Sequence, residues 1–276
     1  MKNIIRKIQI STIILFYFSC GAPNSKYFYL GENGFTCMCP NTKVGEKGKI
    51  NGVIYESVDI NLLKKRIEEG KDLSKLCTSL VTDMSFLFFQ NNDFNQSIGN
   101  WDVSNVTSMN SMFKEITFNL PIGSWNVRRI TDMSDMFSYS HFNQPIGDWD
   151  VGNVANMFSM FWNSRFNQPI DDWDVSDVNN MSFMFSDSHF NQHLQNWDVN
   201  SVSFMSFMFA GSVFNRPIGN WDVKYVEDME YMFWDSRFNQ DISKWCVQKI
   251  KSIPEAFSID SPLTREKGPK WGTCPA

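Results

Sequence analysis

Hydrophobic and polar positions along this chain follow one period of 24 residues. Seven tryptophans mark the period without an insertion or a deletion, and a valine stands two positions after each of them. Methionine pairs closed by a phenylalanine recur at the same period. A fixed period of this size indicates an array in which each unit buries its apolar side chains only against its neighbours. The tryptophans are Trp101, Trp125, Trp149, Trp173, Trp197, Trp221 and Trp245.

Within one unit, the pattern predicts one short strand and one short helix. Trp101-Asp102-Val103 alternates apolar and polar residues, as a half-buried strand does. Val106, Met109 and Met112 then follow at the three- and four-residue spacing of a helix. We therefore predict an α/β repeat over residues 77–257, a solenoid of about seven turns whose strands stack in parallel.

The segments on either side of the array do not share its period. Residues 36–76 predict an N-terminal cap made of a hairpin and a helix. Asn51-Gly52 between two short apolar runs is a hairpin signal, and Asp59 is a suitable N-cap for the helix that follows. Residues 21–35 indicate a tether, and residues 258–276 indicate a capping tail rich in turn residues.

The N-terminus predicts export. Lys2 and Arg6 precede a short apolar run, which is too short to cross a bilayer and instead indicates a signal peptide over residues 1–20. Cys20 follows the run directly, as the lipid-accepting cysteine of a bacterial lipoprotein does; the alternative is an ordinary signal peptide cleaved nearby. We expect an outer-membrane-anchored lipoprotein at the cell surface, which contacts the membrane by its lipid anchor only. Without the lipid, it would be secreted.

The remaining cysteines suggest that both ends of the array are tied down, because export permits disulfides. A bridge between Cys246 and Cys274 would hold the tail over the last unit. Cys77 is expected to pair with Cys37 or with Cys39, which leaves one thiol over.

Charge and motifs argue against several classes of function. The net charge is −5 and no basic cluster stands out, so no nucleic-acid partner is expected. His141 and His189 share one variable slot of the repeat instead of forming a catalytic constellation with His193. The chain shows no nucleophile elbow, phosphate loop or metal-ligand motif, so we predict no enzyme activity, no cofactor and no metal.

Two polar columns are interpreted as structural. The asparagines from Asn95 to Asn239 are expected to satisfy backbone groups of adjacent turns. The aspartates that follow the tryptophans, such as Asp102, favour turn or cap chemistry, and the alternative is Ca²⁺ bound between neighbouring carboxylates.

Large aromatic residues replace polar ones in two variable slots of the repeat. An exposed apolar patch of this kind is typical of an interaction surface. The alternative is that these rings complete the core. The candidate binding residues are Trp162, Phe183, Phe207, Tyr231 and Trp234.

The units, of which residues 142–161 are an example, combine Phe-Asn-Gln, Trp-Asp-Val and Met-x-x-Met-Phe. In this combination they resemble the BspA-like leucine-rich-repeat surface proteins over about residues 77–257. The resemblance implies a leucine-rich-repeat-like solenoid on the cell surface, adhesive in some members and without a general catalytic activity. The expected function is a scaffold for protein–protein contact or cell adhesion, with an extracellular protein or a cell-surface ligand as its partner. The alternatives are a self-assembling envelope protein and a carbohydrate-active enzyme.

Overall fold

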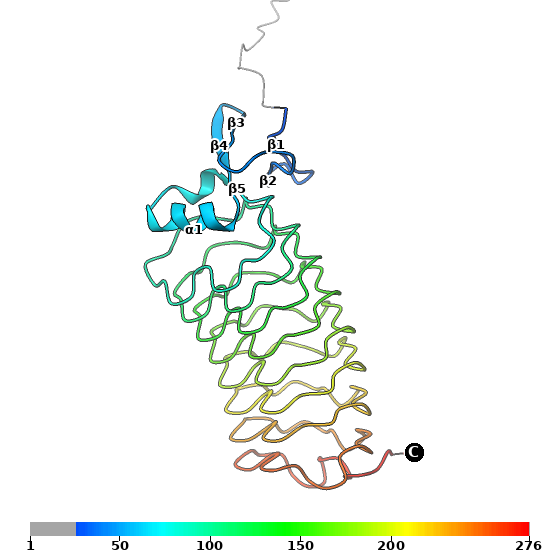
Figure 1. Ribbon diagram of the computed structural model, residues 1–276. Helices are drawn as coiled ribbons and strands as arrows, with labels where there is room; N and C mark the ends of the chain where they lie inside the picture. Colours follow the sequence, from blue (N-terminus) through cyan, green and yellow to red (C-terminus); the bar gives the residue numbers. More distant parts are fainter. Residues whose placement is uncertain (1–25, 276) are drawn as a thin grey trace, which may run out of the picture.

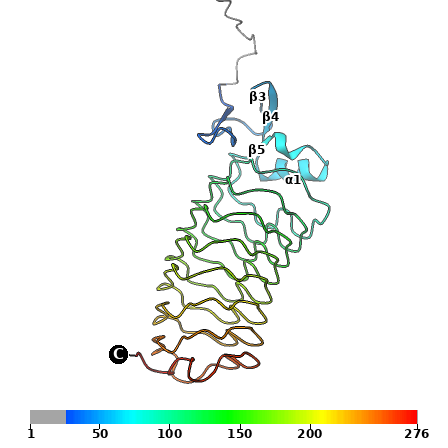
Figure 2. The same ribbon diagram turned by 180° about the vertical axis from the view of Figure 1, so that it is seen from behind.

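Each 24-residue unit makes one circuit of backbone, which we call a layer, and successive layers stack along one axis (Figures 1 and 2). The computed structural model describes residues 26–275. The N-terminal elements lie at one end of the stack, and the C-terminal tail lies at the other (Figure 1).

The predicted α/β solenoid, with a strand and a helix in each of about seven turns, is wrong. Among the described residues, helices and strands are confined to the segment 29–77. The layers that follow consist of turns and irregular backbone, and strand-type pairing between them is limited to isolated parallel bridges. These bridges pass through one slot of the repeat, which holds Asp83, Ser108, Asp132, Asn156, Asn180, Phe204 and Asp228.

The helix prediction failed because backbone hydrogen bonds here run between layers. The backbone N–H of Met181 donates to the carbonyl of Phe204 at 2.9 Å, and the N–H of Phe183 donates to the carbonyl of Ser206 at 2.9 Å. Between these bonds, the N–H of Met184 closes a tight turn on the carbonyl of Met181. In a run of such turns, every third or fourth side chain points into the core. The apolar residues therefore have the same spacing as in a helix.

The strand prediction failed for a related reason. Trp173 and Val175 are buried and Asp174 between them is exposed, as the alternation predicted. The N–H of Trp173, however, bonds to the carbonyl of Ile170 within its own layer, so it closes a turn and joins no ladder. Alternating burial therefore occurs here without a strand.

The tryptophan column both fills the core and joins the layers. Every tryptophan of the column is buried, and the indole N–H of Trp173 donates to the carbonyl of Ile146 in the preceding layer at 3.1 Å. The same bond recurs along the column, for example from Trp149 to Ile122 and from Trp221 to Leu194. An indole can fill this position because its one polar group finds a partner.

The two polar columns have the roles expected of them. The side-chain oxygen of Asn143 accepts a bond from the backbone N–H of Asn167 in the next layer at 2.9 Å, which confirms the asparagine prediction here and at the equivalent pairs. The carboxylate of Asp174 accepts a bond from the N–H of Ser176 at 3.1 Å, which confirms the turn role of that column.

The N-terminal end contains a hairpin and the α-helix. Strands β3 (Lys47–Ile50) and β4 (Val53–Ser57) pair antiparallel around Asn51-Gly52. Both turn residues have positive φ, 49° and 87°, which is the geometry that Asn-Gly favours. Helix α1 (Ile60–Glu68) is capped at its N-terminus by Asp59, whose side chain accepts a bond from the N–H of Leu62 at 2.8 Å.

Four short elements join this end to the first layer. Strands β1 (Tyr29–Leu30) and β2 (Cys37–Met38) pair antiparallel, and the 3₁₀ helix η1 (Leu73–Lys75) leads into β5 (Leu76–Cys77). Strand β5 pairs in parallel with β4. The backbone N–H of Cys37 donates to the carbonyl of Asn100, so β2 is bonded directly to the array.

Disulfides lie at both ends of the stack. Cys39 is bonded to Cys77, and Cys246 is bonded to Cys274. Cys37 is the free thiol among the described cysteines, and burial, together with the charge of Asp102, raises its pKa to about 12. Cys20, the predicted lipidation site, lies outside the described residues.

Candidate functional site

One corner of each layer requires backbone conformations that suit glycine. In the tight turns of this corner, the third residue has a left-handed φ, which glycine and asparagine adopt most easily. Ser111, Asp135 and Ser159 occupy the slot in three of the layers. In three successive later layers, however, the slot holds Phe183 (φ 59°), Phe207 (φ 56°) and Tyr231 (φ 57°).

The rings in this slot stack on one another along the array. The ring centroids of Phe183 and Phe207 are 4.5 Å apart, and so are those of Phe207 and Tyr231, with interplanar angles of 7° in both pairs. Each ring therefore covers the face of the next and turns an edge toward the outside.

Other aromatic side chains extend this stack at both ends. Trp162 lies 5.7 Å from Phe183 and 4.9 Å from Tyr139, and Trp234 meets Tyr231 edge-on at 6.3 Å. Phe158 also contacts Phe183 at 5.7 Å. We call this continuous series the aromatic strip. Its members are Tyr139, Phe158, Trp162, Phe183, Phe207, Tyr231 and Trp234.

The aromatic strip lies on the surface. Tyr139 and Trp234 are each 41 % exposed, and the remaining members are half-buried. The structure thus brings all five candidate binding residues into one series. The prediction omitted Tyr139, although its slot otherwise carries polar residues such as Glu115 and Asp187, and that contrast was the available signal.

Carboxylates fix the polar ends of two strip residues. The indole N–H of Trp162 donates to the carboxylate of Asp187 at 3.2 Å. The hydroxyl of Tyr231 donates to Glu255, and this hydrogen bond raises the pKa of Tyr231 above its usual range. The phenol therefore stays protonated near neutral pH and acts as a hydrogen-bond donor held in one orientation.

The backbone conformation of the strip is unfavourable for its own side chains. Left-handed φ at a bulky residue costs about 1–3 kcal/mol, and such outliers gather at functional sites. Stacking of neighbouring rings stabilises the folded state by about 0.5–1.5 kcal/mol for each pair. Serine occupies the same slot at Ser111 and Ser159, so the layer does not need an aromatic side chain there in order to close.

The residues weighed for catalysis or metal binding lie apart from the strip's rings or serve the scaffold. His189 Nδ1 is 3.2 Å from the carbonyl of Ser164, a backbone contact between layers. Methionines of the paired columns, such as Met181 and Met184, are fully buried. Within residues 26–275, no group of three or more histidine, cysteine or acidic side chains is arranged to hold a metal ion.

The described part of the chain contains no helix with the length and hydrophobicity that a membrane span requires.

Comparison with known proteins relates the array to one family. The model of DUF285, described as a Mycoplasma protein of unknown function, matches residues 60–167 and again residues 163–271. No curated protein and no solved structure matches the chain. The two tandem matches together cover most of the layers.

Proposed function

We propose that this chain, which belongs to the DUF285 family, is a non-catalytic repeat scaffold that binds an extracellular protein or a cell-surface ligand through the aromatic strip. The family description assigns no function, so the proposal depends on the molecular surface. The observation that carries it is the continuous, partly exposed series of rings across successive layers.

Three properties of the strip support binding. Contiguous exposed apolar surface marks interaction sites, and tryptophan and tyrosine dominate the energetic centres of protein interfaces. Neighbouring rings and carboxylates hold the side chains of Phe207, Tyr231 and Trp162, so little conformational entropy is lost when a partner binds. The aromatic residues also occupy a backbone slot that disfavours them, which argues for a role other than folding.

The finer assignment follows from the sequence. The repeat resembles the BspA-like surface proteins, some of which mediate adhesion, and we propose the same role here. The N-terminal apolar run followed by Cys20 supports placement at the cell surface by a lipid anchor.

A binding screen with a matched pair of variants tests the strip. The full chain is presented to an array of extracellular matrix proteins, cell-surface glycans and a second copy of itself. The test variant combines Phe183→Ser, Phe207→Ser and Tyr231→Ser, because serine occupies this slot in other layers and the variant is therefore expected to fold. We expect it to lose at least about tenfold in affinity for whichever component the natural chain binds.

The control variant is Tyr225→Ser, which removes an exposed tyrosine outside the strip and should leave the affinity unchanged. Equal binding by the triple variant and the natural chain would show that the aromatic strip is not the binding surface. Self-association lost in the triple variant would instead favour an envelope protein that assembles with its own copies.

The proposed anchor has a separate test. Cys20→Ser should move the protein from the membrane fraction of its host to the soluble or secreted fraction. Fractionation that does not change would rule out lipidation at this cysteine.

A further inference from the structure

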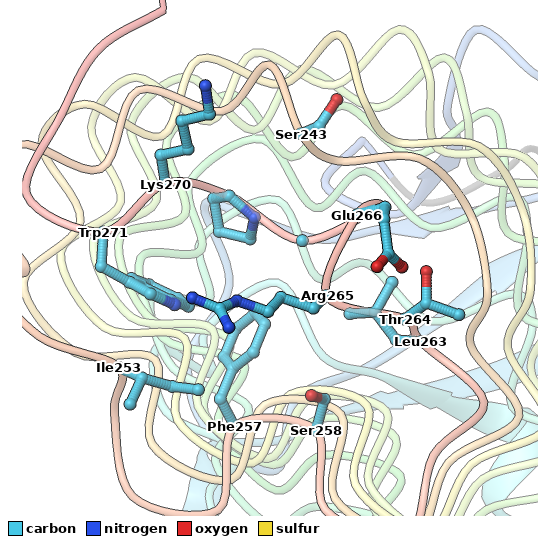
Figure 3. A pocket seen from close by; sticks show the side chains of 12 residues that line it. Ser243, Ile253, Phe257, Ser258, Leu263, Thr264, Arg265, Glu266, Lys270 and Trp271 are labelled. Atoms are coloured by element: carbon cyan, nitrogen blue, oxygen red, sulfur yellow. The ribbon is translucent and has the colours of Figure 1, made fainter.

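The C-terminal tail does not pack flat on the last layer but encloses a cavity of about 900 Å³ (Figure 3). Residues from the end of the array, among them Ile253 and Phe257, form part of its lining, and tail residues between Leu263 and Trp271 form most of the remainder. Figure 3 shows the side chain of Arg265 among the residues that line this space.

The walls of this cavity are fixed to the array. The backbone N–H of Val247 donates to the carbonyl of Thr273 at 2.9 Å, and the N–H of Gly272 donates to the carbonyl of Ile250 at 2.8 Å. The disulfide between Cys246 and Cys274 closes the same segment. The cavity is therefore preformed, as ligand pockets usually are.

Its lining combines apolar surface with two cations and one carboxylate, that of Glu266. The rings of Phe257 and Trp271 meet edge-on at 4.8 Å, and Leu263 adds aliphatic surface. Arg265 and Lys270 supply the positive charge. Among the hydrogen bonds and ion pairs of residues 26–275, none involves the guanidinium of Arg265 or the ammonium of Lys270.

The carboxylate of Glu266, the next residue in the chain, forms no ion pair with the guanidinium of Arg265. The pKa of Glu266 lies below its usual range, chiefly because its carboxylate accepts hydrogen bonds from the backbone N–H of Glu266 and from the side chain of Thr264. Arg265 contributes to this shift only as a nearby charge. The guanidinium thus remains free to bind an anion in the two-pronged geometry that carboxylates, sulfonates and phosphates accept.

We propose that this cavity binds a small organic anion with an aromatic or aliphatic body. Phe257, Leu263 and Trp271 would contact the body, and Arg265 and Lys270 would hold the anionic group. The volume lies within the range of about 300–1,000 Å³ that is typical of small-molecule sites. The site is separate from the aromatic strip and does not depend on the function proposed for it.

Fluorescence titration of the full chain with anilinonaphthalene sulfonate tests this site, because the probe joins an aromatic body to a sulfonate. We expect saturable binding with one site per chain and weaker binding of phenylnaphthylamine, which lacks the sulfonate. Arg265→Gln should weaken binding of the sulfonate by about tenfold, the effect of losing one charge-assisted hydrogen-bonded contact. It should leave binding of the uncharged compound unchanged.

Arg165→Gln serves as the control, because it removes an exposed arginine from a layer far along the chain from the cavity. Thermal unfolding of each variant shows whether the tail remains folded; Arg265 is exposed, so its substitution should not change the midpoint. The proposal is overturned if Arg265→Gln and Arg165→Gln bind the sulfonate equally, or if the uncharged compound binds as tightly as the sulfonate. It is also overturned if a second copy of the chain fills the cavity. Sedimentation would show this as self-association of the natural chain that the variant Ile253→Lys, at the rim of the cavity, abolishes.

Discussion

At the scale of single residues, the repeat is defined by side chains that both fill space and make one bond to a neighbouring layer. Trp173 fills the core and donates to Ile146, and Asn143 bonds to the backbone of the next layer. A phenylalanine would satisfy only the packing requirement, and a serine only the hydrogen bond. This double requirement explains why tryptophan recurs seven times at one position.

The indole bond is testable in the middle of the array. Trp173→Phe keeps a large ring but removes one of the two donors to the buried carbonyl of Ile146, which the backbone N–H of Trp149 also reaches. We expect the free energy of unfolding to fall by about 0.5–1.5 kcal/mol, the net contribution of one hydrogen bond, measured by denaturant titration. The matched control is Trp234→Phe on the exposed strip, which should change stability by less than about 0.5 kcal/mol. Equal stability of Trp173→Phe and the natural chain would show that packing alone selects tryptophan.

At the scale of elements, a strong ion pair joins a strand to the helix at the N-terminal end. The guanidinium of Arg66 on α1 makes two bonds of 2.7 Å to the carboxylate of Glu56 on β4. These bonds lower the pKa of Glu56 below its usual range, and both side chains are half-buried. The pair therefore fixes the helix against the hairpin.

The ion pair should give this end a specific acid sensitivity. Because the folded-state pKa of Glu56 is depressed, its stabilisation is present above pH 4.5 and is lost as the pH falls through the folded-state pKa. Arg66→Met should lower the free energy of unfolding near neutral pH by about 1–3 kcal/mol and flatten its decline in acid. Lys65→Met, which removes a far more exposed cation of the same helix, is the control and should preserve the acid profile. An unaltered acid profile in Arg66→Met would contradict this assignment.

Elements with local signals were predictable, and those built by contacts between layers were not. Asn51-Gly52 and Asp59 fixed the positions of the hairpin and the helix because turn and cap chemistry act within a few residues. The helix and strand of each layer were predicted wrongly. The period of apolar residues indicates which side chains are buried, but it does not indicate which groups the backbone N–H and C=O bond to.

The same distinction separates the two candidate sites. Strip residues such as Phe207 were visible because they replaced polar residues in a regular slot. The cavity around Arg265 had no such signal, because the tail shares no period with the array and the cavity forms only where the tail crosses the last layer.

At the scale of the whole molecule, one continuous core runs through the stack and is closed by different structures at its two ends. Leu63 of α1 and Leu73 of η1 belong to the same buried cluster as the layers. At the other end, Phe257 completes the core, and Trp271 of the tail packs against it. An array whose units bury their apolar surface only against neighbours needs such closures, because its terminal layers would otherwise face water.

Removing the C-terminal closure should destabilise the array from that end. The double variant Cys246→Ser and Cys274→Ser opens a bridge across 28 residues, which should cost about 2–4 kcal/mol of stability. Limited proteolysis should then cut first near the C-terminus. The corresponding double variant of Cys39 and Cys77 should instead expose the N-terminal end. Identical cleavage patterns in the two double variants would show that the array unfolds as one unit.

The unbroken 24-residue register also bears on how such a molecule changes over generations. Each layer offers the next layer the same bonds that it received, as the asparagine series shows from Asn119 to Asn239. Recombination between two repeats of one gene would therefore delete or duplicate a whole layer and keep the recurring asparagine bond at the new junction. The length of the stack, and with it the number of rings in the strip, is a quantity that selection can adjust in steps of one layer without redesigning either end.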